Sequence, residues 1–194
     1  MSIVSPPREL DKAEAERESQ EAANDSPRVY VACLAAYNAG TLHGEWMDAA
    51  QEEEDLLEAI QDMLARSPEP SAEEWAIHDY ECFGGLRLGE YEDLGRVAEL
   101  ARLIDEHGAA FAAYAGNVGT EHATGDGFEE CFRGEWDSEE AYAEDLFDEL
   151  YLNEVPQTLR SYVDYQAFAR DLFMGDYWSA DNPAGGVFVF DGNC

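Results

Sequence analysis

The chain has 194 residues, of which 45% are hydrophobic and 12% aromatic, so it is long enough for one substantial core or for two or three small cores in series. It contains 44 Asp and Glu residues against 11 Lys and Arg residues, which gives a formal net charge of -33. This balance excludes a protein that binds nucleic acid directly. The aromatic content argues against a wholly disordered acidic chain, so the charge lies on a folded body.

The negative charge is concentrated in the body of the chain. Residues 29–194 hold 37 of the acidic residues and 7 of the basic residues, and they contain no lysine. Such self-repulsion keeps a protein soluble but opposes its compact state. Composition leaves three explanations open: a domain adapted to high salt, an acidic chaperone-type partner of a basic protein, and a mimic of a polyanion.

The four cysteines, Cys33, Cys82, Cys131 and Cys194, lie at least 49 residues apart. No close pair suits a zinc site or a redox motif, so we interpret them as buried or free thiols. The sequence has no apolar run long enough to span a membrane, and its start lacks the basic and apolar regions of a signal peptide. We therefore predict a cytoplasmic protein that does not enter membranes.

The N-terminal arm is predicted over residues 1–28, where large apolar residues are scarce. Such a segment buries too little apolar surface to offset its chain entropy. We expect a disordered arm with a transient helix over residues 9–23.

An N-terminal α+β domain is predicted over residues 29–83. Apolar runs over 29–36, 41–47 and 75–81 are typical of strands. Between the second and third strands, from Gln51 onwards, the apolar residues have the spacing of one helix face, which predicts an acidic amphipathic helix. These residues are Leu56, Leu57, Ile60, Met63 and Leu64. The expected order is therefore β-β-α-β.

A small central helical domain is predicted over residues 84–125. Its apolar stripe has helical spacing and ends at Gly108, and it consists of Leu94, Val97, Ala101 and Ile104. The alanine-rich residues 109–118 predict a further helix. A glycine-rich run then leads into the next domain.

A C-terminal α+β domain is predicted over residues 126–194. It begins with a strand over 129–136, followed by a helix capped by Asp137 or Ser138. Asp164 caps a further short helix, and an apolar strand over 186–190 ends the domain. The whole chain is thus expected to be an elongated α+β protein with three small domains in series.

Two segments of the chain are similar to each other. Residues 44–60 and 134–150 align without a gap and both begin with Gly-Glu-Trp. Each predicts the end of a strand followed by an acidic amphipathic helix. The alignment indicates either a reused supersecondary unit or chance agreement between two acid-rich segments.

No residue is assigned a catalytic, cofactor-binding or metal-binding role, and no cofactor is expected. Nothing in the sequence matches a P-loop, a dinucleotide fingerprint or an EF-hand loop. The four histidines occur in no metal-binding or nucleophile motif, and they are His43, His78, His107 and His122. With 44 carboxylates, sequence spacing cannot single out the pair that a glycosidase needs.

The placement of the acidic residues is more informative than their number. Glu140/Glu144, Glu144/Asp148 and Asp145/Glu149 are like-charge pairs four residues apart on the predicted helix. Each pair costs about 0.2–0.5 kcal/mol relative to a neutral arrangement. An ordinary solvated helix face mixes charges of both signs. The repeated cost favours a function for the carboxylates.

The charge also suits a mimic of DNA. B-DNA carries one charge per roughly 1.7 Å of axis. The net charge of -30 on residues 29–194 therefore matches about 50 Å of duplex, or about 15 base pairs. Such a surface would compete for any basic DNA channel of suitable shape, with strong salt dependence.

Five segments of the chain form a specific pattern when taken together and in this order: VYVACLAAYNAGTLHGEW (29–46), IHDYE (77–81), FRGEWDSEEAYAEDLFDELY (132–151), YVDYQAFARDLFMGDY (162–177) and VFVF (187–190). In this pattern the chain resembles the ArdA antirestriction proteins of conjugative plasmids and transposons. The resemblance spans about residues 28–190.

The resemblance implies a DNA mimic that inhibits type I restriction-modification enzymes by occupying the DNA channel of the methyltransferase core and the restriction complex. It also implies a curved, three-domain α+β fold and a homodimer formed through the C-terminal domain. The helix over residues 139–154 falls in the region that the family associates with antirestriction activity. The tail over residues 1–27 is longer than the family pattern.

We accordingly predict that a distributed acidic surface binds the partner enzyme. Its residues are Glu52, Glu53, Asp55, Glu58, Asp62, Glu90, Glu92, Asp93, Glu129, Glu130, Glu135, Asp137, Glu139, Glu140, Glu144, Asp145, Asp148 and Glu149.

Overall fold

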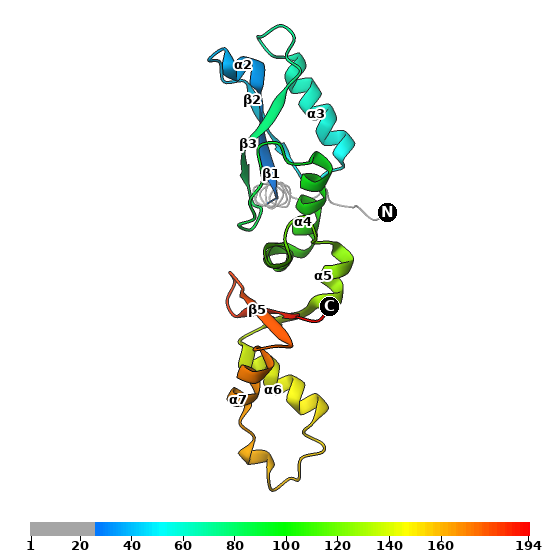
Figure 1. Cartoon of the computed structure of the whole chain (residues 1–194), viewed down its shortest axis with the longest axis vertical. Coiled ribbons are helices and arrows are strands. Elements are labelled where there is room, and N and C mark those ends of the chain that lie inside the picture. Colours follow the sequence, from blue (N-terminus) through cyan, green and yellow to red (C-terminus); the bar gives the residue numbers. More distant parts are fainter. Residues whose placement is uncertain (1–25) are drawn as a thin grey trace, which may run out of the picture. The chain divides into compact units, whose positions relative to one another are not determined.

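The computed structural model describes residues 26–194, so most of the predicted arm, including its expected helix, lies outside the described residues. The protein is a mixed α+β protein, as predicted from the sequence. Its described residues form two compact units (Figure 1). Unit 1 ends at Glu106, and unit 2 comprises His107–Cys194.

Unit 1 contains a three-stranded antiparallel sheet with the order β2-β1-β3. The strands are β1 (Arg28–Cys33), β2 (Gly44–Asp48) and β3 (Trp75–Glu81). The first strand was expected to continue to residue 36, but a short helix, α2 (Leu34–Asn38), follows Cys33 directly. Alanine favours helix and is depleted in strands, which accounts for the early end of β1.

Helix α3 (Glu53–Ala65) lies against the sheet of unit 1 (Figure 1). Its apolar stripe buries Leu56, Ile60 and Met63 completely. The Nε2 atom of His43 lies 2.7 Å from the carbonyl oxygen of Met63, which joins the end of the helix to the segment before β2. The sequence therefore predicted the helix and these three buried residues, whereas Leu57 of the same predicted apolar face is 38% exposed.

Helix α4 (Leu94–Val118) is interrupted at Gly108, which has φ 65° and ψ -150°. Only glycine adopts such angles without strain. The stripe predicted before Gly108 is buried, and the alanine-rich segment after it is helical, as predicted. The interruption lies next to the division between the two units.

Unit 2 contains a second three-stranded antiparallel sheet with the order β4-β6-β5. The strands are β4 (Phe132–Trp136), β5 (Tyr177–Asp181) and β6 (Val187–Asp191). Strand β5 was not predicted. The strand predicted over 129–136 begins only at Phe132, because its first residues belong to helix α5 (Gly125–Cys131).

The capping of α5 explains this difference. The Thr124 hydroxyl oxygen accepts a hydrogen bond from the Gly127 backbone N–H at 3.1 Å. This N-cap starts a helix in the glycine-rich run, where the sequence predicted no helix. The helix ends where β4 begins.

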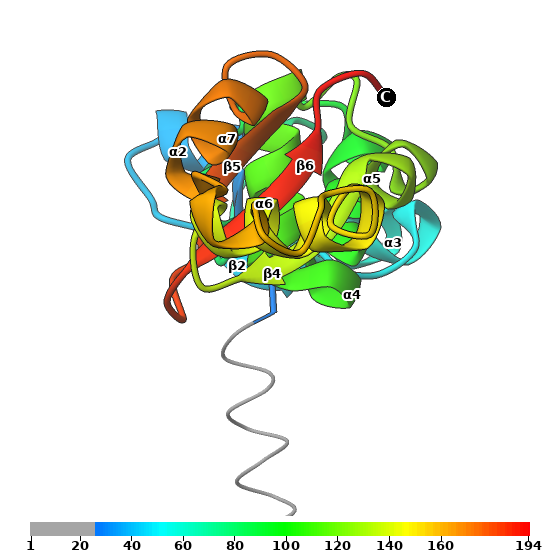
Figure 2. The same cartoon turned by 90° about the horizontal axis from the view of Figure 1, so that it is seen from below.

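Two helices complete unit 2 beside its sheet, α6 (Glu139–Leu150) and α7 (Tyr165–Leu172), with a 3-10 turn at Arg160–Tyr162. The Ser138 hydroxyl caps α6 and the Asp164 carboxylate caps α7, as predicted. The two helices lie against each other (Figure 2).

The core of unit 2 is largely aromatic. Phe128 lies 4.9 Å from Phe132 and 5.6 Å from Phe111, measured between ring centroids. Trp178 stacks on Phe190 at 4.1 Å. These rings come from α4, α5 and all three strands of the sheet, so their packing joins the elements of unit 2.

One disulfide corrects the interpretation of the cysteines as thiols. Cys131 and Cys194 are joined, with 5.4 Å between their Cα atoms. Cys131 directly precedes β4 and Cys194 follows β6, and these strands are antiparallel neighbours with Phe132 opposite Phe190. Strand pairing therefore brings together two cysteines that are 63 residues apart in sequence. Cys33 is a buried thiol, as expected.

Candidate acidic interface

The outer face of α3 presents acidic side chains to solvent. Glu53 and Asp55 lie in its first turn, where the positive end of the helix dipole stabilises carboxylates. Glu58 and Asp62 continue the acidic face towards the other end of the helix. All four are exposed, because the apolar stripe holds the opposite face against the sheet.

Helix α6 presents a second acidic face. The Ser138 hydroxyl oxygen accepts a hydrogen bond from the Ala141 backbone N–H at 3.1 Å, which fixes the start of the helix. Tyr142 and Ala143 are buried and set its orientation. The carboxylates on the rest of the surface are exposed, and they are Glu139, Glu140, Glu144, Asp145 and Glu149.

The remaining predicted residues of unit 2 lie near the start of its sheet. Glu129 and Glu130 are exposed on α5, and not on a strand as expected. Glu135 on β4 and Asp137 just after it are also exposed. Burial first, and then the charge of Glu130, raises the pKa of Tyr114 above its ordinary value.

Six of the predicted carboxylates accept hydrogen bonds from the protein itself. Their donors are the Arg102 guanidinium for Glu52, the Gly89 N–H for Glu92, the Arg96 N–H for Asp93, the Asn182 amide for Glu135, the Ser179 hydroxyl for Glu139 and the Tyr165 hydroxyl for Asp148. The side chains of the other twelve make no hydrogen bond or ion pair within residues 26–194.

Asp148 is a predicted carboxylate whose hydrogen-bond partner lies within the protein. It is half-buried, and it accepts a hydrogen bond of 2.7 Å from the Tyr165 hydroxyl, which joins α6 to α7. This hydrogen bond is the main cause that raises the pKa of Tyr165. The sequence indicated a surface carboxylate here, but its contact is structural.

Most of the positive charge is masked by neighbouring carboxylates. Six of the eight arginines in residues 26–194 form ion pairs, namely Arg28–Glu81, Arg66–Glu45, Arg96–Glu99, Arg102–Glu52, Arg133–Asp191 and Arg170–Asp171. Arg66 binds both oxygens of Glu45, at 2.7 and 2.9 Å. This hydrogen bonding, and then the charge of Glu45, raises the pKa of Arg66.

The two units are similarly acidic. Residues 26–106 contain 19 acidic and 5 basic residues, and residues 107–194 contain 18 acidic and 3 basic residues. The predicted surface therefore consists of two groups, Glu52 to Asp93 on unit 1 and Glu129 to Glu149 on unit 2. No charged residue among those described is buried.

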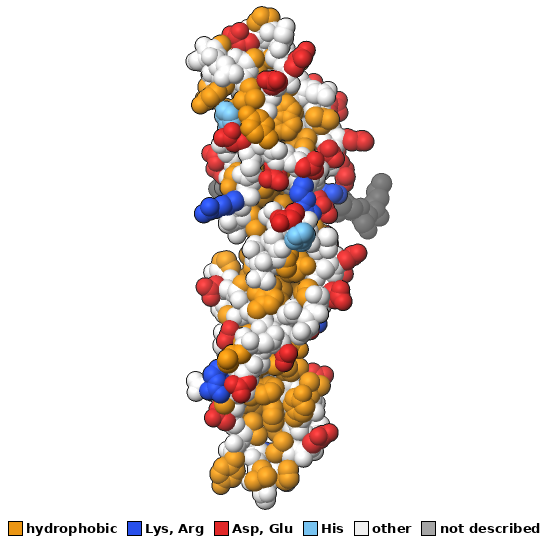
Figure 3. Space-filling model, in the orientation of Figure 1, with side chains coloured by type: hydrophobic (Ala, Val, Ile, Leu, Met, Phe, Trp, Pro, Cys, Tyr) orange, Lys and Arg blue, Asp and Glu red, His pale blue; other side chains and the backbone are white. Residues whose placement is uncertain are grey.

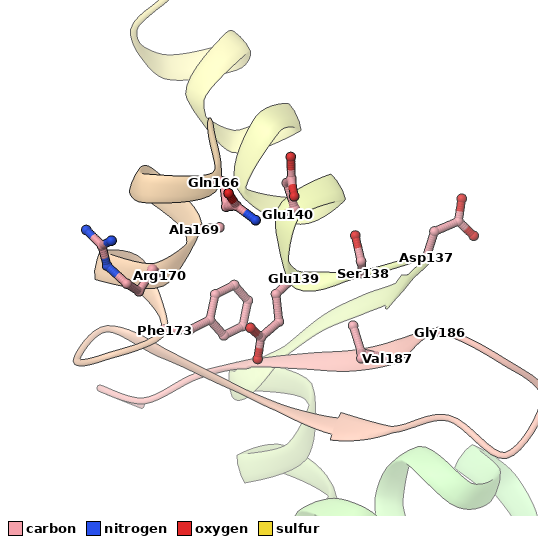
Figure 4. A pocket seen from close by; sticks show the side chains of 10 residues that line it. All are labelled: Asp137, Ser138, Glu139, Glu140, Gln166, Ala169, Arg170, Phe173, Gly186 and Val187. Atoms are coloured by element: carbon pink, nitrogen blue, oxygen red, sulfur yellow. The ribbon is translucent and has the colours of Figure 1, made fainter. Parts of the chain in front are cut away.

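A pocket of about 660 Å³ in unit 2 brings three predicted residues together (Figure 4). Asp137, Glu139 and Glu140 line it from the start of α6, and the Phe173 ring lies beside the Glu139 carboxylate. Arg170 of α7 also lines the pocket, and its guanidinium binds the neighbouring Asp171. Carboxylates beside an aromatic ring suit a cationic group. The sequence missed Phe173, because its position depends on the packing of α7 against α6.

Unit 2 also exposes apolar side chains. Figure 3 shows them gathered over the part of unit 2 built by α6 and α7. The large exposed residues there are Leu150, Tyr151, Leu159, Tyr162 and Met174. A contiguous exposed apolar patch commonly marks a protein–protein contact.

Residues 26–194 contain no group of three or more His, Cys, Asp and Glu side chains placed to hold a metal ion. Within the same part of the chain, no helix is both long and apolar enough to cross a membrane.

Comparison with known proteins identifies the family. Among curated proteins, the search finds no match to this chain. A family model described as "Antirestriction protein (ArdA)" matches residues 29–183, which cover most of the 194 residues. ArdA proteins are inhibitors of restriction and not enzymes. The match includes the acidic faces of α3 and α6 and ends before β6 (Val187–Asp191), and the chain therefore belongs to the ArdA antirestriction family.

Proposed function

We propose that the protein is a DNA mimic that inhibits type I restriction-modification enzymes by occupying their DNA-binding channel with its acidic surface. The observation that carries this proposal is the state of the predicted carboxylates: sixteen of the eighteen are exposed, and twelve have no partner within residues 26–194. A carboxylate without an internal partner is available to a basic side chain of the enzyme. Such contacts replace those made by the phosphates of DNA.

The proposal includes a homodimer formed through residues 126–194, in a cytoplasmic protein that does not itself bind nucleic acid. The exposed apolar residues beside α6 and α7 support a protein contact in this region. We also keep the division into three domains, over residues 29–83, 84–125 and 126–194, as part of the proposal. The inhibitor is expected to bind both the methyltransferase core and the restriction complex.

A competition assay tests the proposal. Labelled duplex DNA is bound to a purified type I methyltransferase, and the protein is added at several salt concentrations. We expect displacement of the DNA, with an affinity that falls steeply as salt rises, because the contacts are between charges. A domain adapted to high salt would instead gain stability with salt and displace nothing. An acidic chaperone-type protein would bind unrelated basic proteins equally well.

Variants test whether the surface acts as a distributed array. Glu140→Gln should weaken displacement by less than about fivefold, since an exposed ion pair contributes about 0.2–1 kcal/mol. Neutralising six carboxylates of unit 2 that lack internal partners should weaken it by roughly tenfold or more. These six are Glu129, Glu130, Glu140, Glu144, Asp145 and Glu149. Loss of all inhibition in a folded Glu140→Gln variant would contradict a distributed surface.

A further inference from the structure

A second pocket, of about 580 Å³, lies in unit 1 next to the outer edge of β3. Its polar and aromatic lining residues are Tyr37, Asn38, Glu74, His78, Glu90 and Tyr91. Only Glu90 among them was predicted as a surface residue. The other five come from segments that the sequence did not connect with binding.

Backbone hydrogen bonds hold the walls of this pocket in place. The Leu34 N–H donates to the Glu74 carbonyl at 3.0 Å, which fixes the start of α2 against the segment before β3. The Ile77 N–H donates to the Glu90 carbonyl at 2.9 Å, which fixes the segment of Glu90 and Tyr91 along the outer edge of β3. The pocket is therefore preformed, and a ligand would find its side chains already positioned.

Two exposed tyrosines stand in this pocket. Tyr37 is 57% exposed and Tyr91 is 73% exposed, so neither contributes much to the core. The ring of Tyr37 meets that of His78 edge to face, with 4.9 Å between centroids. This contact holds Tyr37 over the pocket. The faces of tyrosine rings attract cations, most strongly when the cation is partly shielded from water.

Two carboxylates accompany the rings. Glu74 and Glu90 are exposed, and their side chains accept no hydrogen bond within residues 26–194. A planar guanidinium can stack on an aromatic ring while its N–H groups bind carboxylates, whereas the compact, strongly hydrated ammonium of lysine does this less well. The pocket thus offers both kinds of contact that an arginine side chain makes.

We propose that this pocket binds a single arginine side chain of the basic protein that the acidic surface engages. This inference rests on the proposed function, since it names one anchoring contact within that interaction. The negative charge of unit 1, with 19 acidic against 5 basic residues in 26–106, attracts a basic partner from a distance. The pocket then selects the arginine by shape and by cation–π contact.

The test uses the full chain with isotope-labelled tyrosine and histidine rings. The probe is a blocked Gly-Arg-Gly tripeptide, and the comparison probe carries citrulline, which has the same shape without the charge. We expect saturable NMR shifts of the Tyr37, His78 and Tyr91 signals with the arginine peptide alone. Tyr91→Ala should weaken its binding about two- to fivefold, as expected for one exposed cation–π contact, and Glu74→Gln should also weaken it.

Matched controls lie elsewhere on the surface. Glu73→Gln changes an exposed carboxylate next to Glu74 that does not line the pocket, and Tyr162→Ala removes a tyrosine of unit 2 that is 81% exposed. Neither should alter binding of the peptide. Shifts that are unsaturable, or equal at Tyr162 and Tyr91, would mean general attraction of cations and would overturn the proposal.

The peptide titration needs no restriction enzyme, so it separates this inference from the proposed function. If the peptide binds but the protein does not displace DNA from the methyltransferase, the pocket is real and the proposed function is wrong. If displacement occurs while the peptide does not bind and Tyr91→Ala displaces DNA as well as the natural protein, the proposed function holds and the pocket has no role.

Discussion

The two units use the same arrangement of strands in a different chain order. Each has an antiparallel sheet in which an edge strand carrying Gly-Glu-Trp is followed by an acidic helix and then by the opposite edge strand. In unit 1 the central strand, β1, comes first in the chain, whereas in unit 2 the central strand, β6, comes last. Moving β1 to the end of unit 1 would reproduce the order of unit 2. The relation is that of a circular permutation.

The similar segments 44–60 and 134–150 therefore occupy equivalent places, yet their last residues differ in burial. Ile60 is completely buried, whereas Leu150, which aligns with it, is 53% exposed. Helix α3 lies along its sheet, while α6 packs chiefly against α7 and has its last residue at the surface. Equivalent patterns of acidic and apolar residues thus form core in one unit and exposed surface in the other.

The two glycines of the Gly-Glu-Trp motifs also serve different purposes. A Cβ atom on Gly44 would lie 2.9 Å from the Cα atom of Ala32 on β1, so Gly44 permits close approach of two strands. Gly134 has φ 103° and lies where the pairing of β4 with β6 shifts register. One motif therefore meets two constraints, one of space and one of backbone conformation.

The largest effect is expected when Ile60 and Leu150, the two apolar residues that align, are replaced one at a time. Ile60→Ala should lower the free energy of unfolding of unit 1 by about 2–5 kcal/mol, because it leaves a cavity in a closed core. Leu150→Ala should lower that of unit 2 by less than about 0.5 kcal/mol in the monomer, because the residue is exposed. Amide hydrogen exchange, followed separately for peptides of each unit, measures both effects.

Leu150→Ala also bears on the proposed homodimer. A variant that keeps the stability of the monomer but weakens self-association would place Leu150 at the subunit contact. Equal losses for Ile60→Ala and Leu150→Ala at a dilution where the chain is monomeric would show that α6 buries its final turn after all.

The disulfide gives the next largest difference, since it lies wholly in unit 2. Cys194→Ser opens a link that spans 63 residues of sequence, which should destabilise unit 2 by about 2–4 kcal/mol. Unit 1 should be unaffected. Cys33 in unit 1 is a thiol and forms no disulfide. Reduction of the natural protein should therefore destabilise unit 2 and not unit 1, as Cys194→Ser does. Increased exchange in both units on reduction would be inconsistent with a link confined to unit 2.

The motif glycines provide a test of intermediate size. Gly134→Ala should destabilise unit 2 by about 1–2 kcal/mol through its positive φ, and Gly44→Ala should destabilise unit 1 by about 1–3 kcal/mol through overpacking against β1. The two losses should respond differently to a second change. Gly134→Asn should recover part of the stability, because asparagine tolerates positive φ, whereas Gly44→Asn should be worse than alanine. Recovery at both positions would remove the distinction.

The sequence predicted those elements whose pattern is local. The buried face of α3, the caps of α6 and α7 and the boundaries of β3 all follow from spacing within a few residues. Helix α5 was missed, because a single cap at Thr124 outweighs a glycine-rich composition. The link between Cys131 and Cys194 was missed too, because it depends on the pairing of β4 with β6.

The acidic surface shows the same limit. Exposure of the carboxylates could be predicted, since a charged residue opposite an apolar stripe faces solvent. Most of the partners within the protein could not be predicted, because their donors lie far away in sequence: Arg102 is 50 residues from Glu52, and Asn182 is 47 residues from Glu135. The donors to Glu92 and Asp93 are the exceptions, since each lies three residues away. The pocket beside β3 was missed for the same reason, since three segments form it.

The smallest predicted effect concerns acid pH and the end of unit 2. The Asn193 backbone N–H, and then Arg133, hold the pKa of Asp191 below its ordinary value. A carboxylate with a lowered pKa in the folded state contributes stability that is fully present above its unfolded pKa of about 3.9, and this stability is lost as pH falls through the folded pKa. Asp191→Asn should therefore destabilise unit 2 by at most about 1 kcal/mol at pH 7, since the side chain is partly exposed.

The difference between Asp191→Asn and the natural protein should shrink as the pH falls below about 4. Hydrogen exchange of unit 2 between pH 3 and pH 7 measures it, after correction for the intrinsic exchange rate. Glu81→Gln, which removes the partner of Arg28, is the matched change in unit 1 and should leave exchange in unit 2 unaltered. An Asp191→Asn effect that stayed constant down to pH 3 would mean that Asp191 acts through packing or hydrogen-bond geometry. In that case the charge of Asp191 would not stabilise the sheet of unit 2, although charge would still matter at the exposed acidic faces of both units.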